Sequence, residues 1–247
     1  MPITSRQNPF IKRVASLKQK KYRDEFGEYI VEGEKLVREA FATGQSVSAV
    51  IIREGLAFEG IPSDLITEVS ESVFKSISDE MTPQGVLAVV KIPESEAIGS
   101  LSRCLVLDGL QDPGNVGAIL MIAAACDVDH VFAVSCADPY SPKAVRSSMS
   151  GLFRTKVVKS DSQTVLNTLR KQNIPIVVAD MGGENVFDCK IGSSYCLILG
   201  NEGNGISEFF RKNSDKTIAI PMQNGIESLN VAVAAGIALY AMAQNQG

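Results

Sequence analysis

The chain of 247 residues is 45% hydrophobic and 21% charged, with a net charge of −4, which is the balance of a soluble globular protein rather than a disordered one. Its length suffices for one large domain or two modest ones. No apolar run reaches the roughly 20 residues of a membrane span, and Met1–Arg6 lacks the apolar core of a secretory signal. We therefore expect a cytoplasmic protein with no membrane partner.

The first part of the chain predicts a small α/β domain. Asn8-Pro9 is typical of a helix start, and the apolar residues after it repeat at helical spacing. Strands are expected over residues 28–31, 47–52 and 85–92, and helices over residues 34–43 and 70–78. We expect this domain to occupy residues 1–92 and to be followed by a linker at residues 93–102, which is rich in serine and acids and contains proline and glycine.

Positive charge is concentrated at the start of the chain, because residues 1–23 contain lysines and arginines but no acid. A basic segment on an otherwise acidic protein is typical of contact with nucleic-acid phosphates. A solvated helix face would have the same composition, so that interpretation stays open. The basic residues are Arg6, Lys12, Arg13, Lys18, Lys20, Lys21 and Arg23.

The second part of the chain alternates more regularly. Strands are expected over residues 104–107, 131–134, 174–179, 195–199 and 217–220, and helices over residues 116–126, 143–149, 162–172, 207–213 and 229–243. This alternation predicts a parallel sheet covered on both faces. In such sheets ligands bind beyond the carboxyl ends of the strands. We expect this second α/β domain at residues 103–247.

Metal and histidine chemistry is not expected. The five cysteines are scattered without a C-x-x-C pair, and His130 is the only histidine and has no partner at ligand spacing. The thiols are best interpreted as buried and reduced.

Three of the expected strands are followed by loops rich in glycine, asparagine and acids, at residues 108–117, 200–205 and 221–230. Glycine permits close approach of the backbone to a ligand, although ordinary turns use the same residue types. Residues 200–205 read G-x-x-G-x-G rather than the dinucleotide-binding G-x-G-x-x-G, and no phosphate-loop or G-x-S-x-G motif occurs. Dehydrogenases, nucleoside triphosphatases and serine hydrolases are therefore disfavoured.

In order, the three loops resemble the motifs of the SpoU/TrmH family of RNA ribose 2′-O-methyltransferases, which belongs to the SPOUT superfamily. The matching segments are L-D-G-L-Q-D-P-G-N-V-G-A-I-L, L-I-L-G-N-E-G-N-G-I and I-P-M-Q-N-G-I-E-S-L-N-V-A-V-A. The first domain, with I-T-S-R-Q-N-P-F-I-K and Y-I-V-E-G-E-K-L-V-R-E-A, is similar to the L30e-like substrate-binding domain that many such enzymes carry.

The resemblance implies an α/β fold of the SPOUT type, with a parallel sheet and a C-terminal trefoil knot. It also implies S-adenosylmethionine as the cofactor, a homodimer with the active site at the subunit interface, and 2′-O-methylation of RNA. We expect 23S ribosomal RNA as the substrate, with transfer RNA as the alternative.

Residue by residue, the resemblance assigns three groups of functional positions. The implied cofactor-binding residues are Ala179, Leu199, Gly200, Asn201, Gly203, Ile220, Met222, Ser228 and Leu229. The implied catalytic residues are Asn115, Glu202, Ser228, Asn230 and Arg146. Arg154 joins the basic residues of the first segment as an expected RNA contact. Some of these positions also have a purely structural interpretation, since Ser228 could cap the last helix and Leu229 could belong to the core.

One position departs from the family pattern. The first motif normally continues to an arginine that is assigned a catalytic role, and Met121 stands at this position. A ribose hydroxyl is a poor nucleophile until its proton is taken up, and methionine is a flexible apolar side chain. Either another basic residue replaces the arginine, with Arg146 and Arg154 as candidates, or the chain is a catalytically impaired protein that binds cofactor and RNA.

Overall fold

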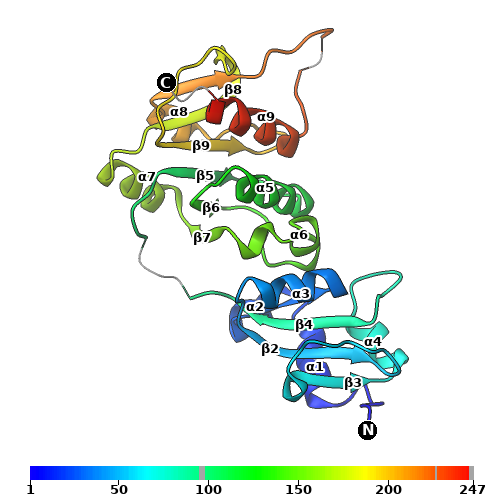
Figure 1. Ribbon diagram of the computed structural model, residues 1–247. Helices are drawn as coiled ribbons and strands as arrows, with labels where there is room; N and C mark the ends of the chain where they lie inside the picture. Colours follow the sequence, from blue (N-terminus) through cyan, green and yellow to red (C-terminus); the bar gives the residue numbers. More distant parts are fainter. Residues whose placement is uncertain (95–97, 226, 245–247) are drawn as a thin grey trace.

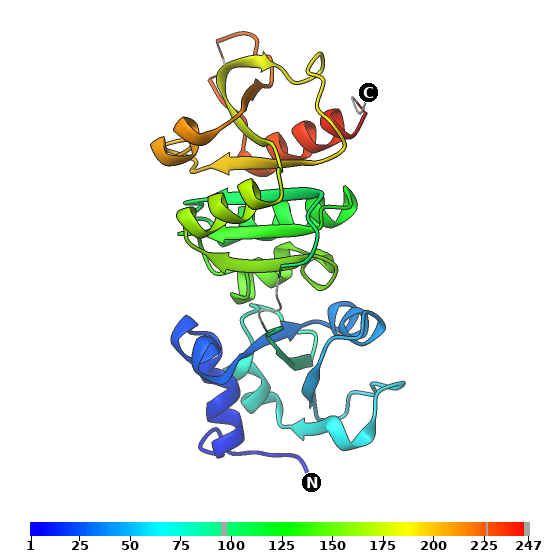
Figure 2. The same cartoon turned by 90° about the vertical axis from the view of Figure 1, so that its left-hand side faces the viewer.

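The computed structural model describes residues 1–94, 98–225 and 227–244. Residues 95–97 of the expected linker, residue 226 of the third loop and the last three residues lie outside the described chain. The described residues fold into two α/β units, which follow each other along the long axis of the molecule (Figures 1 and 2). We call the unit that ends before the linker the N-terminal domain and the other the C-terminal domain.

The N-terminal domain is built on a mixed sheet. Within the described residues its order is β1-β4-β2-β3, where β4 is antiparallel to β1 and β2, and β3 is parallel to β2. The strands are β1 (Glu28–Glu32), β2 (Val47–Arg53), β3 (Ile66–Val69) and β4 (Val86–Lys91). Four helices accompany it, namely α1 (Pro9–Ser16), α2 (Lys20–Phe26), α3 (Glu34–Ala42) and α4 (Glu71–Ile77).

Alternation along the strands separates the two faces of this sheet. Ile30 packs with α1 and α4 in one core, whereas Tyr29 and Val31 face α3 in another core, which continues into the C-terminal domain. The start of α1 is as expected, because the Asn8 side chain accepts a hydrogen bond from the backbone N–H of Phe10 at 2.9 Å. Strand β3 and helix α2 were not expected from the sequence.

The C-terminal domain contains a parallel sheet, which confirms the expected architecture. In the described chain its order is β10-β8-β9-β5-β6-β7 and every recorded pairing is parallel. The strands are β5 (Arg103–Asp108), β6 (His130–Val134), β7 (Lys156–Ser160), β8 (Ile176–Asn185), β9 (Tyr195–Gly200) and β10 (Lys216–Ala219).

Helices cover both faces of the parallel sheet. On one face lie α5 (Pro113–Ala125), α6 (Pro142–Ser147) and α9 (Val231–Gln244), and on the other α7 (Ser162–Lys171) and α8 (Glu208–Asn213). After the edge strand β10 the chain returns as α9 to pack beside α5 and β9. A C-terminal knot needs such a return, and the knot itself follows from the resemblance rather than from this contact.

Strand β8 is longer than expected, since it runs on through Asp180 to Asn185. Its second half is polar and contains two glycines, so it carries no apolar strand pattern. It is held by β10, whose register on β8 shifts between Thr217 and Ile218. A Cβ on Gly183 would lie 2.6 Å from a backbone carbon of Ile218, so the absence of a side chain permits this close contact. The shift leaves residues 179–183 of β8 between two paired stretches, and the strands pair again at their carboxyl ends, where Ala219 lies opposite Asn185.

The cysteine thiols are mostly buried, as expected; Cys104, for example, is inaccessible to solvent. Burial raises the pKa of Cys104 to about 12, which keeps it protonated and unreactive. Among the described residues, no His, Cys, Asp and Glu side chains group to hold a metal ion. No helix in the described chain has the length and apolar character needed to cross a membrane.

Candidate cofactor cavity and the residues around it

A cavity of about 660 Å³ lies between residues 179–181 within β8 and the loops that follow β9 and β10. Its walls combine apolar side chains, such as Leu199 and Ile218, with several glycines and alanines, and helix α9 contributes Ala234 and Ala238. This is the carboxyl edge of the parallel sheet, where ligands of such sheets bind. The cavity lies where the sequence places a binding site.

All of the residues that the resemblance assigns to the cofactor line this cavity. They are Ala179, Leu199, Gly200, Asn201, Gly203, Ile220, Met222, Ser228 and Leu229. Glu202 and Asn230, two of the expected catalytic residues, line it as well. The structure thus brings together positions that are up to 51 residues apart in the sequence, from Ala179 to Asn230.

The loop after β9 is closed by backbone contacts and by Asn201. Asn201 and Gly205 exchange two backbone hydrogen bonds of 2.9 Å. The Asn201 side-chain oxygen accepts from the N–H groups of Gly203 and Asn204, and its amide donates to the carbonyl of Gly109 at 2.8 Å. Asn201 therefore shapes its own loop and ties it to the loop after β5.

Gly200 is required by this geometry. A Cβ at position 200 would lie 2.3 Å from the carbonyl carbon of Gly205 and 2.3 Å from the nitrogen of Ile206. Both atoms belong to the backbone, so neither could move without opening the loop. This is the close backbone approach that the glycines of the sequence indicated.

Three polar side chains, from the first turn of α5 and from the loops after β9 and β10, meet beside the cavity. The Asn115 amide donates to Oε1 of Glu202 at 2.9 Å, and its oxygen accepts from the Asn230 amide at 3.0 Å. Asn230 also accepts from the backbone N–H groups of Ala232 and Val233, so it caps α9. The structural interpretation of Ser228 as the cap of this helix is therefore wrong. We call Asn115, Glu202 and Asn230 the amide–carboxylate group.

The charges around the cavity suit a positively charged ligand with an apolar part. The charged lining residues are Asp180, Glu202, Arg211 and Glu227, and Arg211 is paired with Asp180 at 3.0 Å. The remaining charged lining residues, Glu202 and Glu227, are negative. Apolar lining residues such as Leu199 and Ile218 offer a surface for an aromatic ring. S-adenosylmethionine, with its sulfonium charge and adenine ring, fits this combination. Sequence reasoning missed Asp180 and Arg211; the position of Asp180 just after the apolar start of β8 was the available signal.

Arg146 does not line this cavity, and its place in the catalytic group stays a prediction. Its guanidinium pairs with Glu80 at 2.8 Å and with Asp79 at 3.5 Å, both in the N-terminal domain. Arg154, the other candidate to replace the family arginine, pairs with Glu39 at 2.7 Å. Both arginines therefore act in the contact between the two domains. The nearest cation to the loop after β5 is instead Lys143, which pairs with Asp112 at 2.7 Å.

The basic residues of the first segment divide into two sets. Arg23 is buried and forms an ion pair with Asp138, so it is not available to RNA, and its expected role is corrected. Lys18 donates to the backbone carbonyls of Ser76 and Ser78, and Arg13 pairs with Glu28 at 2.6 Å. Arg6, Lys12, Lys20 and Lys21 are exposed.

Comparison with known proteins agrees with this fold. Residues 102–240 match the SpoU rRNA methylase family, and residues 8–88 match the MRM3-like substrate binding domain. The chain belongs to the SpoU rRNA methylase family.

Three similar proteins span nearly the whole chain. The 23S rRNA (guanosine(2553)-2′-O)-methyltransferase RlmP of Bacillus subtilis is 31% identical over 245 residues, which cover 96% of this chain and 97% of the relative. A TrmH-family protein from Porphyromonas gingivalis has a structure with a TM-score of 0.85 and 34% identity, covering 94% of this chain and 96% of that one. The SpoU methyltransferase AviRb from Streptomyces viridochromogenes, solved with AdoMet, has a TM-score of 0.86 and 25% identity, covering 96% and 98%.

Proposed function

We propose that the protein transfers the methyl group of S-adenosylmethionine to the 2′-oxygen of a ribose in 23S ribosomal RNA. The observation that carries this proposal is the cavity, in which residues 179–181 of β8 and the loops after β9 and β10 meet beside the amide–carboxylate group. Membership of the SpoU rRNA methylase family supports the reaction type. The similarity to RlmP, named for 2′-O-methylation of 23S rRNA, favours this substrate over transfer RNA.

The cofactor, when bound, supplies an electrophilic methyl group, and the chain positions the two reactants. The loop after β9 and apolar lining residues such as Leu199 and Ile218 would hold the cofactor. The ribose hydroxyl becomes a good nucleophile only as its proton is taken up. We assign Glu202 as the group that orients the hydroxyl and receives this proton, because it is the carboxylate of the amide–carboxylate group. Asn115 donates to Oε1 of Glu202, so Oε2 would be the oxygen that receives the proton. Positioning of this kind supplies a large part of the rate enhancement.

The direct test uses labelled cofactor with 23S ribosomal RNA and, separately, with transfer RNA, followed by mass-spectrometric mapping of the methylated ribose. We expect label in 23S RNA at a single ribose. Label in transfer RNA alone would favour the alternative substrate. Calorimetry with S-adenosylmethionine accompanies the assay, because tight binding without transfer would favour a protein that binds cofactor and RNA but does not turn over.

Met121 does not contribute the proton acceptor that its position would offer in the family. It is 41% exposed on α5, and the backbone of Gly151 packs against its Cα atom. We expect Met121→Arg to leave the methyl-transfer rate unchanged or to raise it, because the site is open enough for a longer side chain. Met81→Arg, at a fully exposed position of the N-terminal domain, is the matched control. A large loss of rate in Met121→Arg alone would mean that the methionine has a role of its own.

We further propose that the protein is a homodimer that forms through α5 and α9. Both helices consist mainly of apolar residues and have no continuous polar face, and a helix of this kind is normally buried. They pack against each other, yet Val233 remains 51% exposed and Tyr240 54% exposed on the outer side of α9. A second copy that covers this face would shield apolar surface and lie beside the cavity, because Val231 and Ala234 of the same helix line it.

The double variant Val233→Asp/Tyr240→Asp is expected to be monomeric, because two buried charges would face each other across the contact. Light scattering coupled to size-exclusion chromatography measures the mass, and methyl transfer should fall with it. Phe187→Asp, at an equally exposed apolar position outside both helices, should leave the mass unchanged. A double variant that keeps the mass of the wild type would place the subunit contact elsewhere.

The exposed lysines of the first segment are proposed to bind RNA phosphates. We expect Lys12→Glu/Lys20→Glu/Lys21→Glu to weaken RNA affinity by at least roughly tenfold, and each lost phosphate contact to reduce the salt dependence of log affinity by about one unit. Filter binding over a series of salt concentrations measures both. Lys171→Glu on α7 is the control. Unchanged affinity and slope in the triple variant would leave these lysines as a solvated face.

A further inference from the structure

The N-terminal domain and the cofactor cavity lie at opposite ends of the parallel sheet. The N-terminal domain contacts α6 and the short helix η2 (Gly151–Phe153), next to the edge strand β7, whereas the cavity opens at β8, β9 and β10 (Figures 1 and 2). Strands β6 and β5 lie between β7 and β9. At about 4.8 Å per strand, β7 and β9 alone are roughly 14 Å apart. An RNA bound to both places must bridge at least this distance.

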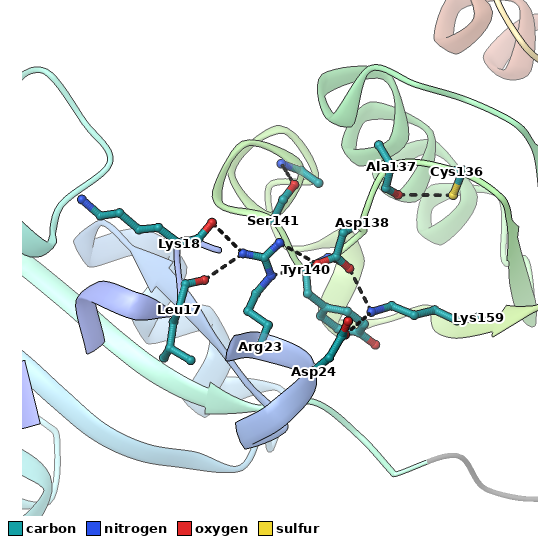
Figure 3. Close-up of polar contacts among 11 residues, drawn as sticks. Leu17, Lys18, Arg23, Asp24, Cys136, Ala137, Asp138, Tyr140, Ser141 and Lys159 are labelled. Atoms are coloured by element: carbon teal, nitrogen blue, oxygen red, sulfur yellow. Dashed lines mark hydrogen bonds and ion pairs between the residues drawn. The ribbon is translucent and has the colours of Figure 1, made fainter. Parts of the chain in front are cut away.

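A buried ion pair stands at the centre of the contact between the domains (Figure 3). Arg23 of α2 donates to Asp138, which follows β6, through Nε at 2.8 Å and through Nη2 at 2.7 Å. The two side chains are only 3% and 4% exposed. Nη1 of Arg23 donates to the backbone carbonyls of Leu17 and Lys18, both at 2.8 Å. Every nitrogen of this guanidinium thus has a partner, and the acceptor from the other domain is Asp138.

Asp138 holds further partners and stays charged. It accepts from the backbone N–H of Tyr140 and pairs with Lys159 of β7 at 3.0 Å, while Lys159 also reaches Asp24 of α2 at 3.3 Å. Burial raises the pKa of Asp138, but Lys159 and Arg23 together outweigh this and hold the pKa below its ordinary value. The carboxylate therefore links α2 of one domain to the strands β6 and β7 of the other (Figure 3).

Other contacts between the domains add to this pair and fix the orientation of the N-terminal domain relative to the C-terminal domain. The rings of Tyr29 and Tyr140 lie 5.1 Å apart. Two further ion pairs join the domains, Glu39 of α3 with Arg154 and Glu80 with Arg146. A buried charge pair is costly unless its geometry is well satisfied, so it favours one orientation over others. Separate contacts around it resist rotation about the pair.

From this arrangement we infer that Arg23 and Asp138 are positioning residues that set which ribose is methylated. They hold the RNA-binding surface of the N-terminal domain at a fixed distance and direction from the methyl donor. The target ribose is then chosen by its position relative to a second RNA element, and the substrate is a folded RNA that presents both together. The inference rests on the proposed methyl transfer to RNA.

The test compares the wild type with Arg23→Gln and Asp138→Asn, and uses 23S ribosomal RNA with labelled cofactor. We expect cofactor affinity to stay at the wild-type level, because neither residue lines the cavity. kcat/KM for RNA should fall by at least roughly tenfold, with the larger change in KM, and mapped methylation should spread from one ribose to its neighbours. Small-angle X-ray scattering should show a broader range of particle dimensions. Arg23→Lys, which keeps the charge, should recover part of the selectivity.

Arg170→Gln is the control, because Arg170 forms a similar pair with Asp215, but on the surface and within one domain. If Arg23→Gln fails to fold, Glu39→Gln and Arg154→Gln loosen the exposed rim and should shift methylation in the same direction, though less. Variants that methylate the same single ribose with wild-type kcat/KM would overturn the inference and leave the proposed function intact. A wild-type protein that binds the cofactor but transfers no methyl group would overturn both this inference and the proposed function.

Discussion

Gly200→Ala is expected to weaken S-adenosylmethionine binding by about 100-fold or more. The added Cβ would lie 2.3 Å from backbone atoms of both Gly205 and Ile206, and neither can move while the two backbone hydrogen bonds between Asn201 and Gly205 persist. Overpacking of this kind costs about 1–3 kcal/mol when side chains can give way and more when only backbone is present. About 2.7 kcal/mol corresponds to a 100-fold change in affinity. Isothermal titration calorimetry measures the loss.

Gly192→Ala provides the matched control for this experiment. A Cβ at position 192 would meet no atom within 4 Å, and the residue is exposed. The same chemical change should therefore leave cofactor affinity and thermal stability as they are. If Gly200→Ala bound the cofactor as tightly as the wild type, the cofactor would have to sit outside the cavity that the loop after β9 encloses.

Asn115→Asp should lower kcat for methyl transfer by about 100-fold and should change cofactor affinity little. A carboxylate at position 115 cannot donate to Glu202, and it places a second negative charge within hydrogen-bond distance of that carboxylate. It still accepts from Asn230, so the third loop keeps its contact. Removing one oriented donor from a reaction site typically costs about 100-fold to 1,000-fold in kcat. Asn115 lies outside the cavity lining, which is why binding and turnover should separate.

Asn167→Asp is the control, since Asn167 is an exposed amide on α7 that accepts from Gln163 of the same helix. Single-turnover measurements with saturating cofactor separate the chemical step from RNA release. If Asn115→Asp kept the wild-type single-turnover rate, the amide–carboxylate group would have to act in RNA binding or in loop closure rather than in the transfer step.

Most of the sheet of the C-terminal domain could be predicted because its strands are short apolar runs between helical segments. Strand β7 was not expected, because lysines flank its pair of valines and none of its residues is buried. The other exceptions also have physical reasons. The second half of β8 is polar and glycine-containing, and it forms only because β10 pairs with it after a shift in register. Helix α2 is almost entirely charged or aromatic and was interpreted only as a basic segment. Strand β3 contains four residues, too few for alternation to be recognised.

The candidate site could also be predicted only in part from the sequence. Residues that act through the backbone of a loop, such as Gly200 and Asn201, were placed correctly in the cavity because the loop sequence itself dictates its shape. Residues that act through a long side chain were not placed correctly from the sequence, because a guanidinium reaches several ångströms from its backbone. Arg23 and Arg146 both turn toward the other domain. Their partners, Asp138 and Glu80, are more than 60 positions away in the sequence, and no local sequence pattern predicts such a pair.

Eight of the 23 residues that line the cofactor cavity are glycine, alanine or serine. At Gly200 the wall is backbone, and any side chain there would collide with the backbone of Gly205 and Ile206. An inhibitor that packs against the backbone at Gly200 would therefore contact a part of the wall that no substitution can enlarge without opening the loop after β9.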